Sequence, residues 1–456
     1  MDLRKAIWAA TLVLAALSMG HVRPALAQTV VLTPDNLERA AFVLLRQGQP
    51  ARALAFAEAL LTQFPQDATA LMLKSRAQRD MARYPQAVHT ARLSWRHAQT
   101  DQDRFGAALA AAQGLASDDK RLLAQLWLRR AMDVAPTPEA RHIAITDFIY
   151  VRSRTRLSVD LDLSVRPSSN VNNGSESDTL WFLGQPFTLS GDARALSGVK
   201  ANLGARFRWR LAESETEKTD LRFEVQQQIV ALSEEAKAQA PAAKGSDYAL
   251  SGVETGLDRY WRPSARGEAI ASLTLGRNWY GGDPMSAYGR VDLAYRHRLT
   301  DTLHLSGSLG LERQDRQDDD LRSATVRSIS FSAAEQLANK DKLILSVAAN
   351  DTQSASSDID HTELFARLGW DRAAPVGQAR LSMGISAGVR DYDQSSYSSD
   401  GRQDKTLGAD LSLAFDQMDY RGFIPILSFE ARKTRSNVSL YDSTTRGIAL
   451  SIRSKF

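Results

Sequence analysis

The sequence predicts a two-part exported protein: an all-α N-terminal part of repeated helices, followed by an antiparallel transmembrane β-barrel of about fourteen strands. Three observations support this fold class. The chain starts with an export signal. Apolar residues then recur at helical spacing up to Tyr150, and apolar and polar residues alternate from Arg156 onward. We expect a signal peptide at 1–27, a helical domain at 28–152 and a barrel at 153–456.

Composition excludes several classes of protein. The chain has 456 residues, no Cys, and 57 Lys+Arg against 53 Asp+Glu, a formal net charge of +4. Without Cys there can be no disulfide scaffold, Cys-ligated zinc, iron–sulfur cluster or thiol nucleophile. Charges of both signs are interspersed, so no clustered basic stripe indicates a nucleic-acid partner. We therefore expect no nucleic acid among the partners.

Residues 1–27 have the layout of a secretory signal peptide. Arg4 and Lys5 precede an apolar run from Ala6 to Leu17, and Ala25-Leu26-Ala27 supplies the small residues of a cleavage site. The alternative, an uncleaved membrane anchor, is disfavoured because the apolar run is too short. The protein is therefore predicted to leave the cytoplasm.

The next segment indicates helical repeats. Ala53 and Ala57 return 34 residues later as Ala87 and Ala91, Pro65 closes the first unit, and a third unit is offset by about three residues. Small residues at this spacing let the two helices of a hairpin approach closely, which is the tetratricopeptide pattern. A generic helical bundle is the alternative. Such repeats stack into a concave surface that binds other proteins and carries no chemistry.

The remainder alternates with period two. Clear examples are residues 157–165, 203–209, 303–311, 381–389 and 448–456, each with one apolar and one polar face. A soluble β-sandwich alternates too, but strands of roughly 9 to 14 residues are long for one and suit tilted membrane spans. The strand number is even, and the connections alternate between long polar loops and tight turns, as in outer-membrane barrels.

Phe456 is a barrel-terminal aromatic that completes the last alternation. Such an aromatic is common in barrels that the outer-membrane insertion machinery assembles, and closure of the barrel pairs every strand edge in lipid. We expect the protein in the cell outer membrane with its helical domain in the periplasm. The barrel insertion machinery and outer-membrane lipid are therefore expected partners.

Several short runs resemble a known family, the surface lipoprotein assembly modulators (Slam), which join an N-terminal tetratricopeptide domain to a C-terminal barrel. The matching runs are residues 167–173 (P-x-S-N-V-N-N), 183–189, 192–194, 435–442, and the junction stretches 129–136 and 147–152. One departure is Ser439, where the family run has Pro.

The resemblance implies a role in moving particular proteins across the outer membrane. Its best-known members deliver lipoproteins to the cell surface, and related ones secrete soluble cargo. The expected partners are therefore an exported lipoprotein or secreted protein cargo, and periplasmic chaperones. The resemblance carries over no catalytic residue, so we expect no enzyme.

The residues themselves give no sign of cofactor or metal chemistry. The chain has no H-E-x-x-H, G-x-S-x-G, Walker or G-x-G-x-x-G motif. Asp318, Asp319 and Asp320 lack the ligand alternation and Gly spacing of a calcium loop, so a solvated loop is the favoured interpretation. We expect no cofactor and no metal site.

One cluster can be placed from topology alone. In a closed barrel the first and last strands pair, so the loops that follow the first strand and precede the last should meet on the extracellular side of that seam. We hypothesise that Asn170, Asn172, Asn173, Tyr441 and Asp442 form a hydrogen-bonded seam cluster there. The alternative is that the Asn residues merely accept turn dihedrals.

Two rival functions stay open at this point. A polysaccharide exporter also joins helical repeats to a barrel, but its lumen should carry mainly one sign of charge. A diffusion porin would leave the repeats without a role. Lumen candidates of both signs occur here: Arg206, Arg208, Arg453 and Lys455 against Asp160, Asp162, Glu224 and Asp410.

Overall fold

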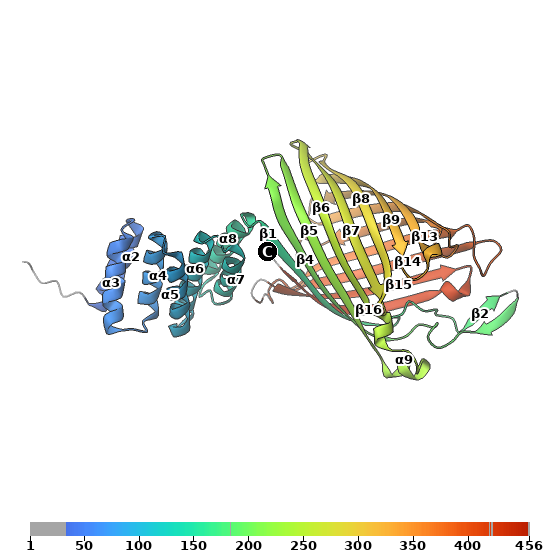
Figure 1. Ribbon diagram of the computed structural model, residues 1–456, viewed down its shortest axis with the longest axis horizontal. Coiled ribbons are helices and arrows are strands. Elements are labelled where there is room, and N and C mark those ends of the chain that lie inside the picture. The colour runs from blue at the N-terminus through green and yellow to red at the C-terminus, as the bar shows by residue number, and fades with distance from the viewer. Residues whose placement is uncertain (1–32, 183, 419, 421–422, 455–456) are drawn as a thin grey trace, which may run out of the picture.

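The computed structural model describes residues 33–182, 184–418, 420 and 423–454. The predicted signal peptide, Lys455 and Phe456 lie outside these residues. A row of paired helices leads into a barrel, and the helical row stands at one end of the barrel (Figure 1). None of the helices in the described ranges is long and apolar enough to cross a membrane.

The helical domain contains seven helices within the described residues: α2 (Pro34–Arg46), α3 (Pro50–Gln63), α4 (Ala68–Asp80), α5 (Tyr84–His97), α6 (Asp101–Ser117), α7 (Arg121–Asp133) and α8 (Pro138–Ser153). Every second helix begins with a side-chain cap. Thr33, Asp67, Thr100 and Thr137 accept hydrogen bonds from backbone N–H groups in the first turns of α2, α4, α6 and α8. These caps fix where each new repeat begins.

Ala residues permit the helices to pack as hairpins. Ala53, Ala57, Ala87, Ala91 and Ala124 are fully buried where α3, α5 and α7 meet their neighbours. The three-residue offset of the third unit has a local cause, since α6 has 17 residues and α4 only 13.

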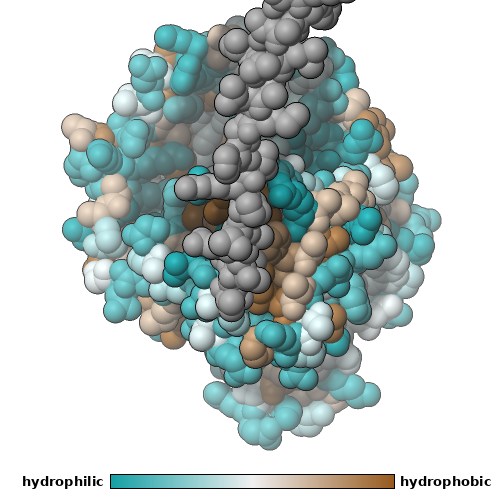
Figure 2. All heavy atoms as spheres, turned by 90° about the vertical axis from the view of Figure 1, so that its left-hand side faces the viewer, coloured by the Kyte–Doolittle hydropathy of each residue, from teal (hydrophilic) through white to brown (hydrophobic). Residues whose placement is uncertain are grey.

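Seen along the domain towards the barrel, the near face is mainly hydrophilic, with hydrophobic residues near its centre beside the part drawn in grey (Figure 2).

Fourteen strands among the described residues close into an antiparallel barrel in the order β1-β16-β15-β14-β13-β12-β11-β10-β9-β8-β7-β6-β5-β4. Their bounds are β1 (Leu157–Ser168), β4 (Gly198–Glu213), β5 (Glu217–Leu232), β6 (Leu250–Ser264), β7 (Gly267–Tyr280), β8 (Asp283–Arg298), β9 (Leu303–Arg316), β10 (Ala324–Gln336), β11 (Lys342–Ser354), β12 (His361–Asp371), β13 (Arg380–Tyr392), β14 (Arg402–Ala414), β15 (Phe423–Ser436) and β16 (Ser443–Ser454). Every strand pairs with its neighbour in sequence except where β1 meets β16 and where β1 meets β4.

The two faces of the barrel differ as the alternation predicts. Large apolar side chains such as Leu161, Leu309 and Ile385 point outward and are more than half exposed. Their sequence neighbours are polar residues or Gly and face the lumen, where ion pairs join adjacent strands. This division suits a wall between lipid outside and water inside.

The helical domain is fixed to the barrel rim by specific contacts. The Arg121 guanidinium donates to the Arg154 carbonyl at 3.1 Å, and the Gln125 amide donates to the Thr155 hydroxyl at 2.9 Å, just before β1 begins. The Arg129 guanidinium lies 4.6 Å from the ring centroid of Phe423, the first residue of β15. Helix α7 therefore contacts both the residues just before β1 and the first residue of β15.

Connections at the far end of the barrel carry structure of their own. The 169–197 loop contains a hairpin, β2 (Thr179–Phe182) and β3 (Gln185–Thr188), and the next long loop contains α9 (Glu234–Gln239). A small apolar core joins the two loops to the end of β5; its buried members are Val171, Leu196, Val230, Leu232, Ala236 and Ala240. These loops are long and polar, as the sequence predicts, but the hairpin and α9 were not predicted.

Candidate functional site

The lumen is lined by paired charges of both signs. Arg206 in β4 donates two hydrogen bonds to Glu224 in β5, at 2.6 and 3.0 Å. Asp160 in β1 accepts from Arg208 at 2.7 Å and from Arg152, which α8 supplies, at 3.4 Å. A helix of the helical domain thus contributes a cation to the lumen wall.

The pattern continues around the barrel. Further ion pairs join Arg166 to Glu430, Arg222 to Glu254 and Asp258, Arg290 to Asp292 and Glu312, Arg367 to Asp410, and Arg390 to Glu363. Arg453 lines a cavity of about 650 Å³ together with Asp160 and Asp162. Because opposite charges neutralise one another at contact distance, the described part of the lumen has no single sign of charge.

The seam between β1 and β16 has the least continuous ladder among the described strands. Its register pairs are Leu163 with Ile452, Ser164 with Ser451, Val165 with Leu450, and Ser168 with Gly447. Each of the other thirteen junctions has ten or more such pairs.

Pro167 accounts for part of this gap. The Ser169 N–H donates to the Arg446 carbonyl at 3.2 Å, so the odd-numbered residues of β1 direct their backbone groups at β16. Pro167 occupies such a position and has no N–H to donate. The seam therefore lacks one ladder hydrogen bond in the middle of its extracellular half.

Above the seam, two of the predicted Asn residues organise the 169–197 loop. Asn170 is 1% exposed, and its amide exchanges two hydrogen bonds with the backbone of Gly174, both at 2.9 Å. Asn172 donates to the carbonyls of Asp192 and Arg194, at 2.8 Å each, and accepts from the Leu196 N–H at 2.9 Å. The Asn172 side chain thus fastens the outgoing strand of the loop to the returning one. Asn173 has a φ of 56°, in the left-handed region that Asn tolerates in turns. For this residue the alternative expectation, that Asn accepts a turn dihedral, therefore describes the structure.

The two distinctive loops meet over the seam. The Glu176 N–H donates to the Asp442 carbonyl at 2.7 Å, and the Ser175 hydroxyl donates to the Ser439 carbonyl at 3.2 Å. The Asp442 carboxylate accepts from Arg435 at 2.8 Å. Ser439 also donates its hydroxyl to the Thr179 carbonyl at 3.2 Å, a bond that Pro at this position could not make.

Tyr441 belongs to a different group of side chains. Its ring lies 3.6 Å from the guanidinium carbon of Arg402, whose other face lies 3.5 Å from the Tyr392 ring. Tyr441 also meets Tyr397 edge-on at 6.4 Å, and Tyr397 meets Phe182 of the β2–β3 hairpin at 6.2 Å. Burial raises the pKa of the Tyr441 phenol.

The structure therefore places the five predicted residues at the same seam but in two groups. No hydrogen bond among the described residues joins Tyr441 to the Asn side chains. Ser175, Glu176 and Arg402, which make the connections, were not predicted from the sequence. Their signal was weak because the contacts join segments more than 30 residues apart, and most use backbone carbonyls that any residue supplies.

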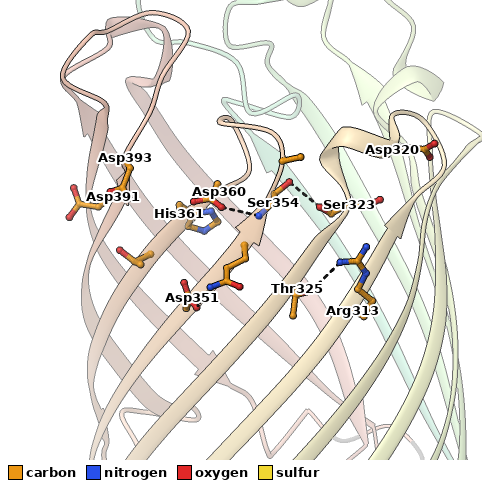
Figure 3. Close-up of a pocket in the computed structure, with 13 residues that line it drawn as sticks. Arg313, Asp320, Ser323, Thr325, Asp351, Ser354, Asp360, His361, Asp391 and Asp393 are labelled. Atoms are coloured by element: carbon orange, nitrogen blue, oxygen red, sulfur yellow. Dashed lines mark hydrogen bonds between the residues drawn. The ribbon is translucent and has the colours of Figure 1, made fainter.

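A polar pocket of about 700 Å³ lies on the extracellular rim between β9 and β13 (Figure 3). Asp360 accepts from the Ser354 N–H at 2.9 Å, and Arg313 donates to the Thr325 hydroxyl at 3.1 Å. Five carboxylates line the pocket: Asp320, Asp351, Asp360, Asp391 and Asp393. Within the described ranges, no three His, Asp or Glu side chains are arranged to hold a metal ion. In the neighbouring loop, a hydrogen bond from Arg316 lowers the pKa of the Asp318 carboxyl to about 2.

Residues 264–456, from the end of β6 onward, match the family model described as surface lipoprotein assembly modifier. The C-terminal region of the barrel is therefore similar to the surface lipoprotein assembly modifier family, over less than half of the chain. The match includes the 435–442 run above the seam but not the 167–194 runs or the helical domain. No curated protein matches the chain.

Solved structures resemble the two parts separately. Acinetobacter baumannii OccAB3 is 9% identical with a TM-score of 0.36, over 64% of this chain and 98% of that one. A bacterial polysaccharide outer membrane secretin is also 9% identical, with a TM-score of 0.34 over 65% of this chain and 98% of that one. The Yersinia enterocolitica type III secretion translocator chaperone SycD is 18% identical, with a TM-score of 0.24 over 27% and 87%. At these sequence identities and TM-scores the solved structures carry no argument about function, so only the family match bears on it.

Surface lipoprotein assembly modifiers translocate surface lipoproteins across the outer membrane, and they are transport proteins rather than enzymes. The barrel of this chain lies in the outer membrane. The family match implies a surface lipoprotein as cargo and a periplasmic place for the tetratricopeptide-like domain. The predicted family, fold class, location and function are confirmed.

Proposed function

We propose that the helical repeats hold the lipoprotein, or a periplasmic chaperone that carries it, directly below the periplasmic mouth of the barrel. The barrel then passes the cargo to the cell surface. The observation that carries this proposal is that α7 and α8 contact the barrel rim. Arg129 of α7 lies over the Phe423 ring of β15, and Arg152 of α8 donates a hydrogen bond to Asp160 of β1.

These contacts with the rim limit how far the repeats can move from the periplasmic mouth of the barrel. Phe423 of β15 and the lumen carboxylate Asp160 of β1 are both contacted by the helical domain, so a flexible linker alone does not connect the parts. A segment held in the repeats would be presented near the lumen at a high effective concentration, which raises the chance of transfer without any new contact.

No nucleotide is available outside the cytoplasm, so transport needs another driving force. Folding or capture of the cargo at the surface removes the unfolded species and pulls the equilibrium outward. A lumen of neutralised ion pairs suits this role, because it offers an unfolded chain no strong site of either charge at which to stall.

The remaining partners belong to assembly. We propose that the barrel insertion machinery closes the β1–β16 seam and contacts Phe456, and that outer-membrane lipid surrounds the apolar wall. We propose domain limits of 28–152 for the helical domain, which holds the cargo or its chaperone, and 153–456 for the barrel, which passes the cargo outward. The seam cluster would hold the 169–197 loop in place above the closed seam.

The first experiment compares surface-exposed proteins in a deletion strain and its parent by protease shaving of intact cells, with whole-cell levels as the control. We expect one or a few lipoproteins to vanish from the surface yet persist inside. Full-length protein should restore them, whereas a variant lacking residues 33–152 should not, although its barrel still migrates as a folded species. Unchanged surface proteins in the deletion strain would contradict the proposal, and polysaccharide and solute flux would then be the functions to measure.

A further inference from the structure

A groove crosses the outer wall of the barrel over the β1–β16 seam, near the extracellular ends of the strands. It has a volume of about 690 Å³ and spans five strands, β5, β4, β1, β16 and β15. On the β1 side of the seam, the register places Ala231, Val199 and Pro167 side by side. On the other side of the seam, Ile448 of β16 lies beside Phe429 of β15. All five side chains alternate onto the lipid-facing side, so the floor of the groove is apolar.

The extracellular edge of the groove is polar. Ser197 and Ser233 place their hydroxyls 2.7 Å apart, and the Ser169 hydroxyl accepts from the Arg446 N–H at 3.0 Å. The exposed Arg446 side chain is the one charged group that lines this edge. The adjoining carboxylate, Glu430, lies on the lumen face and is bound to Arg166 at 2.6 Å. The groove thus combines an apolar floor with hydroxyl and cationic donors at the level where strands leave the membrane.

We propose that this groove binds the acyl chains of the cargo's lipid anchor as the anchor enters the outer leaflet. The proposal rests on the lipoprotein transport described above and names where the anchor is received. The floor is continuous with the lipid-facing belt, so an acyl chain can enter it sideways without crossing a polar surface. Ester and amide carbonyls of an acylated glyceryl-cysteine accept hydrogen bonds, which the Ser hydroxyls and Arg446 can donate.

The position over the seam supports this occupant over bulk lipid. A lipid anchor has to reach the membrane from the transport path, and β1–β16 is the junction with the fewest register pairs among the described strands. Pro167 both removes a seam hydrogen bond and forms part of the groove floor. The weakest part of the wall and the groove therefore coincide.

The direct test uses the unaltered full-length protein in lipid nanodiscs of phosphatidylethanolamine and phosphatidylglycerol. The probe is a synthetic triacylated cysteinyl lipopeptide with a diazirine in one acyl chain, and crosslinked residues are located by mass spectrometry. We expect crosslinks to concentrate at residues 167–169, 197–199, 231–233 and 446–448. Unlabelled lipopeptide should compete, whereas the unacylated peptide and lipid A should not. Crosslinks spread evenly around the barrel, or equal competition by lipid A, would overturn the proposal.

A pair of variants tests the groove in cells. Ala231→Trp fills the floor, and Ala387→Trp makes the same change at an exposed, lipid-facing position of β13 on another part of the wall. We expect Ala231→Trp to lower surface display of the lipoprotein about tenfold, a change of roughly 1.4 kcal/mol, at unchanged whole-cell levels. Ala387→Trp should behave as the parent.

The outcomes separate the two proposals. If the deletion strain loses display but Ala231→Trp does not, the groove proposal fails while lipoprotein export stands. If the deletion strain keeps normal display, export itself fails. Should Ala231→Trp not fold, as judged by its migration on a gel without heating, the crosslinking pattern of the unaltered protein decides.

Discussion

At the scale of single residues, Asn172 shows how one side chain can hold a long loop. Its amide makes four hydrogen bonds to backbone groups on both sides of the 169–197 loop, to Gly174, Asp192, Arg194 and Leu196. A backbone carbonyl left unsatisfied inside the loop costs about 1–3 kcal/mol. The sequence alone predicted a special role for this residue but not its partners.

Asn172→Ala should therefore loosen the loop without unfolding the barrel. We expect protease cleavage within residues 176–195 on intact cells to become about tenfold faster, because the free energy of local opening of the loop decreases. The matched control is Asn173→Gly, since Gly adopts the positive φ of that position without strain. Equal cleavage rates for Asn172→Ala and the parent would show that the loop is held elsewhere.

At the scale of elements, α8 carries a charge that its packing disfavours. Asp147 is half-buried, and burial raises its pKa, while a hydrogen bond from Gln113 of α6 acts in the opposite direction. A carboxyl with a raised folded pKa stabilises the fold least when it is ionised. Stability is then lost as pH rises from the ordinary value of 3.8 through the raised folded value.

Asp147→Asn should raise the melting temperature of the helical domain by a few degrees at neutral pH, and the gain should shrink as pH falls towards 4. The measurement is thermal loss of the helical circular dichroism signal in the full-length, detergent-solubilised protein. A gain that did not change with pH would point to packing rather than charge.

At the scale of the whole molecule, the closed barrel depends on the pairing of its first and last strands. Ser164 and Ser451 are opposite each other across this seam and face the lumen. They occupy a non-hydrogen-bonded pair, in which Cα atoms lie about 4.5 Å apart, within the range of a disulfide. The native chain has no Cys that could interfere.

We expect the oxidised double variant Ser164→Cys, Ser451→Cys to fold but to lose surface display of the lipoprotein, and a reductant to restore it. The matched control joins Ser332 and Ser346 across β10 and β11, where the two hydroxyls are 2.6 Å apart, and should export normally. Export by both oxidised variants would mean that the seam stays shut during transport and that the anchor leaves by another path.

Different parts of the molecule were predictable to different degrees. The 34-residue spacing of Ala residues and the alternation in the barrel follow from packing geometry that repeats locally, so helices, strands and their faces could be predicted. The third repeat was harder, because the extra turn of α6 shifts the register. The hairpin in the 169–197 loop and α9 were not predicted, since short polar segments gain their structure from each other.

The two-part fold, the outer-membrane location and the family resemblance could be predicted from the sequence, because each depends on a local pattern or on residues adjacent in the chain. The export signal stays a prediction, since residues 1–27 lie outside the described part of the chain. Which residues meet at the seam could be seen only in the folded barrel. It separated Tyr441, which stacks on Arg402, from the Asn network that Ser175 and Glu176 join to Ser439 and Asp442. It also decided that the lumen charges pair and that a groove lies over the seam. These features join residues far apart in sequence, and barrel closure is the physical event that brings them together.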